Sequence, residues 1–592
     1  MPKEEGFSFK NIFVPLTTKN AITFIIIIGL VVYLNSLFNG FIGDDYGQLV
    51  NNAAAHSIGN IIQFFTGSTF NNSTFSGIGN SVSNGLEGIY YKPFLSTVFS
   101  ILYTFSGNRA FGYHFFQLIL HIANSILLFL IFKKFLKRET ALGKAFIFLV
   151  HPINNESVVF VSALQEPLFM IFGLLAFYLT LSEKQGIGTN IATVLLLLLS
   201  ILSKETGVLF ILIVPLFQIL FHKSWKVSLL QSAAVLTIYS IFRFGIAHIY
   251  INHNSTLVTI PFINASLAQK LENMPLIIYS YLRVFFYPKD LLMGQSWIIT
   301  VINFSNFYLP LLIDSVFFLI IALFGVVIYK RHKSLFKYYI FFAIWFVLGL
   351  SAHLQLIPLD ATISNRWFYF PVAGLIGMIG VILNTLNFNN RRIISIYLIT
   401  LVVIAILFGV RDFNSNTNWG SELTLYRYET AHSPDDYKLQ FTYANAMSNA
   451  GNQREALSHI LYSIKLHPTA ESFDLLALIY VKSNKIENAK SALNMALNLD
   501  GNSFDTYVLF AEFMLQYDKP QPTITLLKKF LTKYPNEPTT WFFLAIKEYG
   551  LGDKADALFS IKKSLSLYPS EKGRNVYSDI LNNKPINVNF SN

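Results

Sequence analysis

The sequence predicts an all-α protein, a polytopic membrane helical bundle followed by an α-solenoid of short repeats. The first observation is a hydrophobic content of 53% over 592 residues, with apolar runs that approach the ~20 residues needed to cross a bilayer as a helix. The second is a set of basic clusters at the ends of these runs. The third is a pattern of small residues that recurs every 33 or 34 residues beyond Arg411.

The bundle is expected to contain about 11 spans. The apolar runs that define them are 21–34, 111–132, 142–150, 168–181, 191–202, 208–221, 227–249, 309–329, 338–356, 367–383 and 393–410. Residues 51–110 are rich in Asn, Ser and Gly and are too polar to span, and charges interrupt 273–308, where we expect interfacial helices. Several runs are well under ~20 residues long, which is tolerated where polar junctions line a protein-walled, water-filled cavity.

Charge placement predicts the orientation of the spans. Residues 1–411 hold 26 Lys and Arg against 14 Asp and Glu, a net charge of +12, whereas residues 412–592 hold 18 against 19, a net charge of −1. The basic clusters at 133–138, 330–337 and 391–392 mark cytoplasmic ends. They place the N-terminus in the cytoplasm, and the odd number of spans places the C-terminal part outside. We expect a multi-pass protein of a prokaryotic plasma membrane, with the endoplasmic reticulum membrane as the alternative.

Composition also excludes two kinds of function. The basic half of the chain is its hydrophobic half, which indicates loop charges that orient spans and no nucleic-acid partner. The sequence contains no cysteine, so disulfides and thiolate metal sites are excluded.

Four repeats are predicted beyond Arg411. Small residues recur at spacings of 33, 34 and 34: Ala444, Ala477, Ala511 and Ala545. Twelve residues after each come Ala456, Ala489, Thr523 and Ala557, and three repeats close on Pro468, Pro535 and Pro569. This pattern is the tetratricopeptide signature, with a plain helical bundle as the alternative. The predicted domains are a membrane domain, 1–411, and an extracytoplasmic tetratricopeptide-repeat domain, 412–592, with a concave binding face.

Charged side chains gather where spans leave the outer face of the membrane. Asp44 and Asp45 follow the first span, at a depth where ionised groups usually persist for function or with a firm partner. The alternative is a helix cap and a solvated loop residue. Outward basic residues, notably Lys92, Lys204 and Arg366, run against the charge bias and therefore indicate a functional role.

Four polar residues share one face of the second span, at i, i+3, i+7 and i+10: His114, Gln117, His121 and Asn124. Hydrogen bonding between helices is favoured over metal ligation by the two histidines, and no metal site is predicted. A divalent cation could be held by the oxygens of Asp44 and Asp45, a role that we rank below proton transfer.

Six motifs occur in one order: Gly43-Asp44-Asp45, Tyr91-Lys92-Pro93, Gly112 to Asn124, His151-Pro152 with Glu156, Ser203-Lys204-Glu205, and Asn365 to Pro371. Together with the repeats, they resemble the GT-C-fold membrane glycosyltransferases, and most closely the transmembrane-and-tetratricopeptide-repeat O-mannosyltransferase family. The resemblance covers nearly all of the chain. It departs from the pattern at Gln165-Glu166, where we expect a stretch that contains Arg.

The resemblance implies a GT-C-type enzyme that moves a mannose-like sugar from a polyprenyl-phosphate donor in the membrane lipid to a hydroxyl acceptor. The acceptor is expected to be Ser or Thr of an extracytoplasmic protein or peptide recruited by the repeats. The polyprenyl-phosphate sugar is a co-substrate, and no cofactor is expected with certainty. Transfer is expected to be a single inverting displacement, with Asp44 or Asp45 as the general base.

Roles are also expected for the other candidates, and two of these residues have an alternative role. Arg366 and Lys92 suit the donor phosphate, and Lys204 either joins them or pairs with its neighbour Glu205. Glu156 either orients an Asp or the acceptor, or is a solvated loop residue. Four further residues are candidates for the cavity wall: His151, Glu205, His114 and His121.

Four rival functions are open. An O-oligosaccharide ligase would carry its key residues in a large late outer loop, whereas the loop at 357–366 is short. A GT-C transferase that modifies a lipid or a glycan is a second enzymatic alternative. A membrane-anchored repeat scaffold does not explain carboxylates and cations on one face, and a transporter is expected to show paired halves.

Overall fold

The computed structural model describes residues 17–69, 90–182, 186–221, 225–250, 261–385, 391–501, 503–517 and 520–586. Within these ranges the chain is helical apart from loops and one antiparallel pair of two-residue strands, β1 (Gly294–Gln295) and β2 (Ile363–Ser364). The all-α prediction is confirmed. The chain divides into two compact units, one that runs to Asp436 and one that begins at Tyr437. The functional domains 1–411 and 412–592 stay a prediction.

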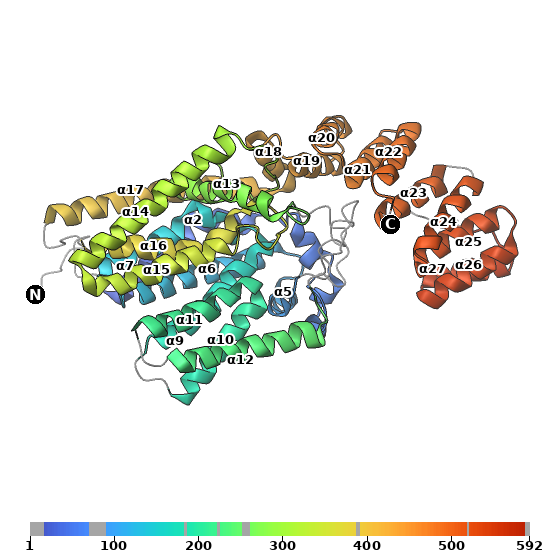
Figure 1. Cartoon of the computed structure of the whole chain (residues 1–592). Helices are drawn as coiled ribbons and strands as arrows, with labels where there is room; N and C mark the ends of the chain where they lie inside the picture. The colour runs from blue at the N-terminus through green and yellow to red at the C-terminus, as the bar shows by residue number, and fades with distance from the viewer. Residues whose placement is uncertain are drawn as a thin grey trace, which may run out of the picture. The chain divides into compact units, whose positions relative to one another are not determined.

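Most helices of the first unit are long and run side by side (Figure 1). The helices of this unit are α2 (Thr18–Tyr33), α5 (Pro93–Ser106), α6 (Ala110–Phe132), α7 (Arg138–Val150), α9 (Gln165–Thr180), α10 (Ile187–Ser203), α11 (Val208–Phe221), α12 (Trp225–Ser240), α13 (Leu267–Phe286), α14 (Leu309–Arg331), α15 (Lys333–Ser351), α16 (Tyr369–Asn384), α17 (Arg391–Asn416) and the shorter α18 (Glu422–His432). Two short helices, α3 (Ile61–Phe65) and α8 (Asn155–Val159), lie in the connections.

The predicted spans fall on these helices. In the part of the chain that the structure describes, 8 helical segments are long and apolar enough to cross a membrane, and they contain α2, α6, α9, α12, α14, α15, α16 and the larger part of α17. The three remaining predicted spans are the shorter helices α7, α10 and α11. The first unit therefore has the helices of a multi-pass membrane protein.

Two expectations about the connections are corrected. Residues 273–308 do not form several interfacial helices: α13 is one continuous helix, and most of 287–303 is non-helical. Arg283 does not interrupt α13, because its side chain is 42% exposed and reaches Asp290 at 3.9 Å beyond the helix end. The polar stretch 51–110 contains α5, an apolar helix of 14 residues that its Ser and Thr content concealed.

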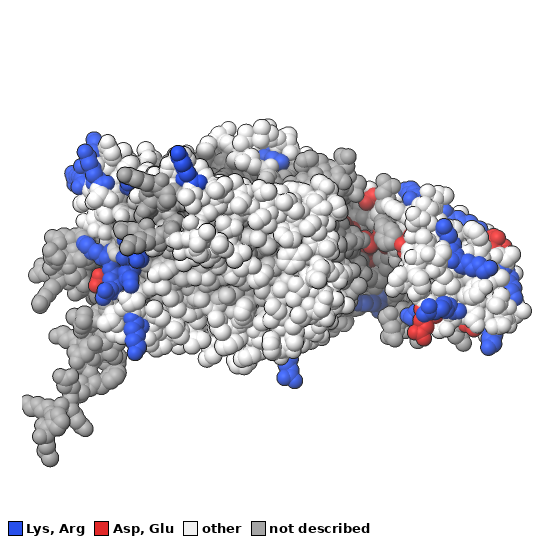
Figure 2. Space-filling model, turned by 90° about the horizontal axis from the view of Figure 1, so that it is seen from below, with Lys and Arg blue, Asp and Glu red and all other residues white. Residues whose placement is uncertain are grey.

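The basic clusters that follow the spans lie at one end of the bundle, and Arg366 lies at the other. Lys133, just after α6, donates from Nζ to Thr18 Oγ1 at the start of α2 (3.0 Å). The α6–α7 junction also touches the start of α15, where the rings of Phe135 and Tyr338 are 5.1 Å apart. The visible face of this unit is a broad uncharged band, with Lys and Arg gathered toward one end (Figure 2). Arg366 precedes the opposite end of α16, so the candidate site lies away from the basic junctions.

The second unit is a series of helical hairpins. They are α19/α20 (Tyr437–Asn449, Gln453–Leu466), α21/α22 (Ala470–Lys482, Ile486–Leu499), α23/α24 (Phe504–Tyr517, Pro520–Lys533) and α25/α26 (Pro538–Gly550, Lys554–Leu567), closed by α27 (Glu571–Leu581). The eight small residues predicted at helix crossings are all buried, each at most 2% exposed. Thr523 replaces the usual Ala because its hydroxyl donates to the Met514 carbonyl across the hairpin (3.3 Å). The repeat prediction is confirmed.

Candidate functional site

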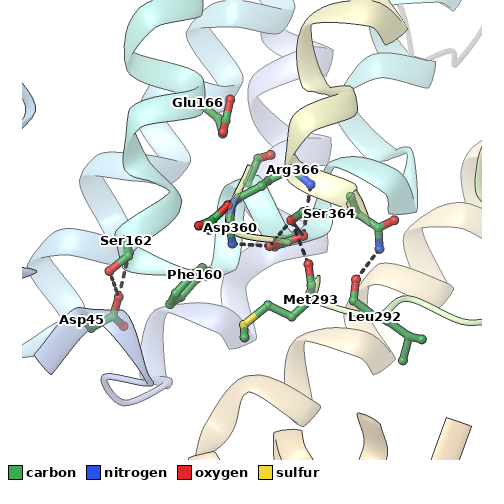
Figure 3. A network of polar contacts seen from close by, with 12 residues as sticks. Asp45, Phe160, Ser162, Glu166, Leu292, Met293, Asp360, Ser364 and Arg366 are labelled. Atoms are coloured by element: carbon green, nitrogen blue, oxygen red, sulfur yellow. Dashed lines mark hydrogen bonds and ion pairs between the residues drawn. The ribbon is translucent and has the colours of Figure 1, made fainter. Parts of the chain in front are cut away.

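The turn after the first span separates the roles of its two aspartates. Asp45 is 1% exposed, and its Oδ2 accepts the N–H of Ile42 (2.9 Å). Its Oδ1 accepts both the N–H (2.7 Å) and the hydroxyl (2.6 Å) of Ser162, which Figure 3 shows beside it. Asp45 therefore ties the turn to the segment before α9. Because both of its oxygens are occupied by protein donors, the pair with Asp44 does not fit a divalent cation held by two free carboxylates.

Asp44 lies on the open side of the same turn. Its side chain is exposed, and among the described residues it makes no hydrogen bond or ion pair. Protein atoms nevertheless crowd the carboxyl, which raises its pKa, while Arg366 and Lys92 oppose that rise and Asp360 adds to it. Asp44 is therefore an exposed carboxylate whose pKa responds to the charges of Arg366, Asp360 and Lys92.

Arg366 is clamped by Glu156, which lies 210 residues earlier in the chain. Glu156 is 3% exposed and accepts the backbone N–H of Arg366 (3.0 Å) and its Nη1 (2.7 Å). Nη2 lies 4.0 Å from Asp360, and the guanidinium lies 5.8 Å from the centre of the Phe160 ring (Figure 3). Burial raises the pKa of Glu156, and the Arg366 charge opposes that rise. Glu156 therefore orients the guanidinium and is not a solvated loop residue.

A second layer holds this ion pair in place. The hydroxyl of Ser364 lies 3.0 and 3.2 Å from the two oxygens of Glu156, and 2.8 Å from the carbonyl of Met293. The side chain of Asn365 donates to the carbonyl of Leu292 at 2.8 Å. The β1–β2 pairing thus fastens the loop after α13 to the residues that carry Arg366 (Figure 3).

Lys92 is a buried cation without an ion pair among the described residues. It is 6% exposed, precedes Pro93 at the start of α5, and holds its Nζ 4.2 Å from the centre of the Tyr90 ring. Burial lowers the pKa of Lys92, while the charge of Glu205 opposes that change most strongly. Of the three predicted phosphate ligands, Lys92 has the least neutralised charge. We call Asp44, Lys92, Glu156, Asp360 and Arg366 the charged cluster.

The predicted alternative that Lys204 pairs with Glu205 is wrong. Lys204 pairs with the buried Glu166, and Glu205 pairs with Arg243 (3.3 Å) and accepts the N–H of Tyr91 (2.8 Å). Lys204 has an extended backbone at the end of α10, so successive side chains point to opposite sides. Glu166, at the point of departure from the family pattern, is therefore the partner of a predicted phosphate ligand.

The predicted histidines are structural in this arrangement. His151 donates to the carbonyl of Phe285 (2.9 Å), accepts the N–H of Ile153 (3.2 Å) and stacks on the Phe285 ring. Burial lowers the pKa of His151 to about 3, so it is neutral. These contacts show that His151 closes the end of α7.

Three of the four polar residues on α6 make the predicted hydrogen bonds to other segments, whereas neither ring nitrogen of His114 has a hydrogen-bond partner among the described residues. His121 contacts the hydroxyl of Tyr369 (2.8 Å) and the carbonyl of Leu149 (2.9 Å), and His114 is buried. Gln117 and Asn124 donate to backbone carbonyls outside α6. Among the described residues, no group of three His, Asp or Glu side chains is placed to hold a metal ion.

Sequence reasoning missed three residues of this region: Arg243, Asp360 and Ser364. Arg243 had a usable signal, because a lone charge inside the apolar run 227–249 is a functional candidate by default. Asp360 and Ser364 lie in a short polar loop, and nothing in their sequence surroundings separates them from ordinary loop residues.

Fold and site together define a multi-pass helical membrane protein with a charged cluster at the helix ends opposite the basic junctions, followed by a tetratricopeptide-like array. Protein O-mannosyl-transferase F38B6.6 of Caenorhabditis elegans is 24% identical over 492 residues, 79% of this chain and 65% of the relative. Protein O-mannosyl-transferase TMTC3 of Homo sapiens is 21% identical over 639 residues, 92% of this chain and 68% of the relative. These similarities confirm the predicted resemblance.

The chain spans about two thirds of the length of these two relatives. Protein O-mannosyl-transferase Tmtc1 of Drosophila melanogaster matches a shorter part, at 27% identity over 200 residues, 33% of this chain and 22% of the relative. No family model matches the chain.

Two solved structures each match between a quarter and a third of the chain. A MamA protein covers 26% of this chain and 84% of its own length, with a TM-score of 0.23 and 15% identity. YrrB, described as a TPR protein with an unusual peptide-binding site, covers 29% of this chain and 87% of its own length, with a TM-score of 0.24 and 12% identity. The repeat assignment rests on the hairpins of the second unit themselves.

Proposed function

We propose that the chain is a membrane glycosyltransferase that moves a mannose-like sugar from a polyprenyl-phosphate donor to a hydroxyl group of a protein. The observation that carries the proposal is that Asp44, an exposed carboxylate without a hydrogen bond or ion pair among the described residues, lies within electrostatic range of Lys92 and Arg366. The names of the relatives support mannose as the sugar and protein as the acceptor.

The proposed step is a single inverting displacement. The acceptor oxygen attacks the anomeric carbon while the bond from that carbon to the phosphate oxygen breaks. The hydroxyl proton passes to the carboxylate of Asp44, and the bonding electrons leave with the polyprenyl phosphate. The raised pKa of Asp44 makes it a stronger base near neutral pH than a free aspartate. Asp45 holds the turn and takes no proton.

Two cations serve the leaving phosphate in different ways. Lys92 brings a charge that no described carboxylate pairs with, so its ammonium can bind phosphate as a point charge. Arg366 is already paired with Glu156, and its buried Nε has no hydrogen-bond partner among the described residues. Glu156 therefore fixes the plane of the guanidinium, and a phosphate oxygen can satisfy the remaining donors. Lys204, neutralised by Glu166, has a supporting role.

The repeats are assigned to the acceptor. The second unit contains a groove of about 390 Å³ lined by both apolar and charged side chains, among them Trp541, Phe559, Lys528, Glu548 and Asp556. Such a surface suits an extended segment of protein better than a lipid or a free sugar. The proposal therefore gives donor and acceptor recognition to different units.

The orientation that this function needs is the one the charge clusters predict, with the charged cluster and the repeats outside the cytoplasm. A cysteine in place of the exposed Lys572 should label with an impermeant maleimide in intact cells, and the chain has no native thiol. Labelling only after permeabilisation would show the opposite orientation, with the repeats in the cytoplasm.

Transfer of radiolabelled mannose by the purified protein tests the proposal. The donor is polyprenyl-phosphate mannose and the acceptor is a Ser/Thr-containing peptide. Asp44→Asn should lose at least a hundredfold in kcat while still binding the donor, because only proton transfer is removed. Lys92→Met should raise the donor KM roughly ten- to a hundredfold, the effect of about 1.5–3 kcal/mol for a charge-assisted contact.

A matched control is the exposed Lys572→Met, which should leave both constants unchanged. A wild-type protein that binds no donor and transfers no sugar would favour the scaffold alternative. Full activity of folded Asp44→Asn would remove the base assignment.

A further inference from the structure

Helix α18, which precedes the repeats, belongs to the first unit. It contacts both the turn that carries Asp44 and the loop that supports Arg366. Helix α18 and the residues after it carry three carboxylates at seven-residue intervals, Glu422, Glu429 and Asp436. On a helix, residues seven apart share one face. Each of these carboxylates accepts a backbone N–H from a distant segment of the first unit.

The first contact reaches the aspartate turn. Glu422 Oε1 accepts the N–H of Gly43 at 3.0 Å, next to Asp44. Gly43 has φ +52°, and a Cβ built on it would lie 3.2 Å from the hydroxyl of Tyr426, which also belongs to α18. Glycine is thus needed where the turn passes under α18, and the turn is fixed from that side.

The second set of contacts reaches the loop that supports Arg366, which we call the 287–296 segment. Glu429 Oε1 accepts the N–H of Met293 (2.7 Å), and Asp436 Oδ2 accepts the N–H of Ser296 (3.0 Å). Met293 in turn offers its carbonyl to Ser364, whose hydroxyl touches Glu156 (Figure 3). A continuous series of polar contacts through Met293 and Ser364 therefore joins α18 to the clamp on Arg366, with the single hydroxyl proton of Ser364 shared between Met293 and Glu156.

The surroundings of Glu429 suit its role as the acceptor of the Met293 N–H. It is 0% exposed, and its Oε2 has no hydrogen-bond partner among the described residues. Burial raises the pKa of Glu429, with the Met293 N–H opposing that rise. An amide side chain at this position would keep the oxygen that receives the Met293 N–H.

We propose that α18 is a positioning helix of the transferase site, in which Glu422 sets the aspartate turn and Glu429 sets the 287–296 segment and, through it, Arg366. The assignment of kinetic effects rests on the proposed function. Glu429→Ala should raise the KM for the lipid donor, because Arg366 loses its support. Glu422→Ala should lower kcat with little change in donor KM, because Asp44 loses its alignment.

Amide hydrogen exchange of the full-length purified protein tests the positioning without needing transfer. Glu429→Ala should speed exchange in a peptide covering 287–296 by about tenfold and leave a peptide covering 40–47 unchanged. Glu422→Ala should do the reverse. Glu429→Gln should restore the wild-type rate and the wild-type KM, since it keeps the acceptor oxygen. The control is Ala431→Ser, at an exposed position of the same helix.

Wild-type exchange of both peptides in folded Glu429→Ala and Glu422→Ala would overturn the proposal. If Glu429→Ala does not fold, Asp436→Ala frees the Ser296 N–H in the same segment and should give the same local acceleration; its absence would equally overturn it. Faster local exchange in a protein that transfers no sugar would leave α18 as a positioning helix and refute the proposed function instead.

Discussion

The contacts inside the two compact units join residues at very different separations along the chain. We call the first unit the membrane unit and the second the repeat unit. In the repeat unit, helix pairs are formed by neighbours in sequence, and the small residues at their crossings lie within a single 33- or 34-residue period. In the membrane unit, the decisive contacts join residues far apart: Asp45 to Ser162, 117 residues away, and Glu156 to Arg366, 210 residues away. The repeat unit can therefore be altered locally, whereas a single change in the membrane unit affects several elements.

The same difference separates the two aspartates of one turn. Asp45 satisfies buried donors from two segments, whereas Asp44 satisfies none among the described residues. Replacing Asp45 would leave buried donors without an acceptor, which costs stability, whereas replacing Asp44 would leave none among the described residues. The hydrogen bonds give Asp45 a structural role, and we propose proton transfer for Asp44.

The largest expected effect is on the stability of the membrane unit. Asp45→Ala leaves the N–H groups of Ile42 and Ser162 buried without an acceptor, at about 1–3 kcal/mol each. The melting temperature of the purified protein should fall clearly. Asp44→Asn, in the matched position without such contacts, should melt as wild type does. Equal melting of all three proteins would contradict the division of roles.

The next effect is confined to the repeats. Ala477→Leu forces extra atoms into a helix crossing where the native side chain is 1% exposed, at about 1–3 kcal/mol. Ala555→Leu adds the same atoms at an exposed position and is the control. Limited proteolysis should cut the Ala477→Leu array earlier, while binding of polyprenyl phosphate stays unchanged. Loss of donor binding in this variant would show that the units are not independent.

How far the sequence predicts each unit follows from the same comparison. The repeats were predictable because Ala444 and its equivalents recur at a fixed period and helix crossings need small residues. The motifs also singled out Asp44, Lys92 and Arg366. No local signal could show that Ser162 would donate hydrogen bonds to Asp45 or that Glu166 would form an ion pair with Lys204. The same holds for Asp412, which accepts hydrogen bonds from Tyr33 and Asn155 (3.2 and 3.1 Å).

The end of the membrane unit was also beyond local reasoning. A change of composition near Arg411 predicts a boundary there, yet α17 continues to Asn416 and the compact unit extends to Asp436. The spacing of Glu422, Glu429 and Asp436 was visible in the sequence, but seven-residue spacing of acids is common on solvated helices. Their partners, Gly43, Met293 and Ser296, become apparent only in three dimensions.

The smallest effect concerns pH. Asp44 must be ionised to accept a proton, so kcat should fall as pH drops through its raised pKa. Lys92→Met removes a cation that favours the ionised form, so the acidic limb should move to higher pH. Asp360→Asn removes an anion that disfavours it, so the limb should move to lower pH. Each shift should be less than about one pH unit in a pH–kcat profile, and shifts in the reverse directions would contradict the role of Asp44.

The central claim is that the first unit, including α18, contains the whole donor site and that the repeats serve the acceptor. Two shortened chains test it most directly, one ending at Asp436 and one ending at Gly420, with binding of polyprenyl phosphate and transfer to a short Ser/Thr peptide as the readouts. The account predicts that the chain ending at Asp436 binds the lipid phosphate and glycosylates the peptide, whereas the chain ending at Gly420 binds it at least tenfold more weakly, because the support from Glu429 is lost. Equal binding by both chains, or no binding by the chain that ends at Asp436, would contradict it.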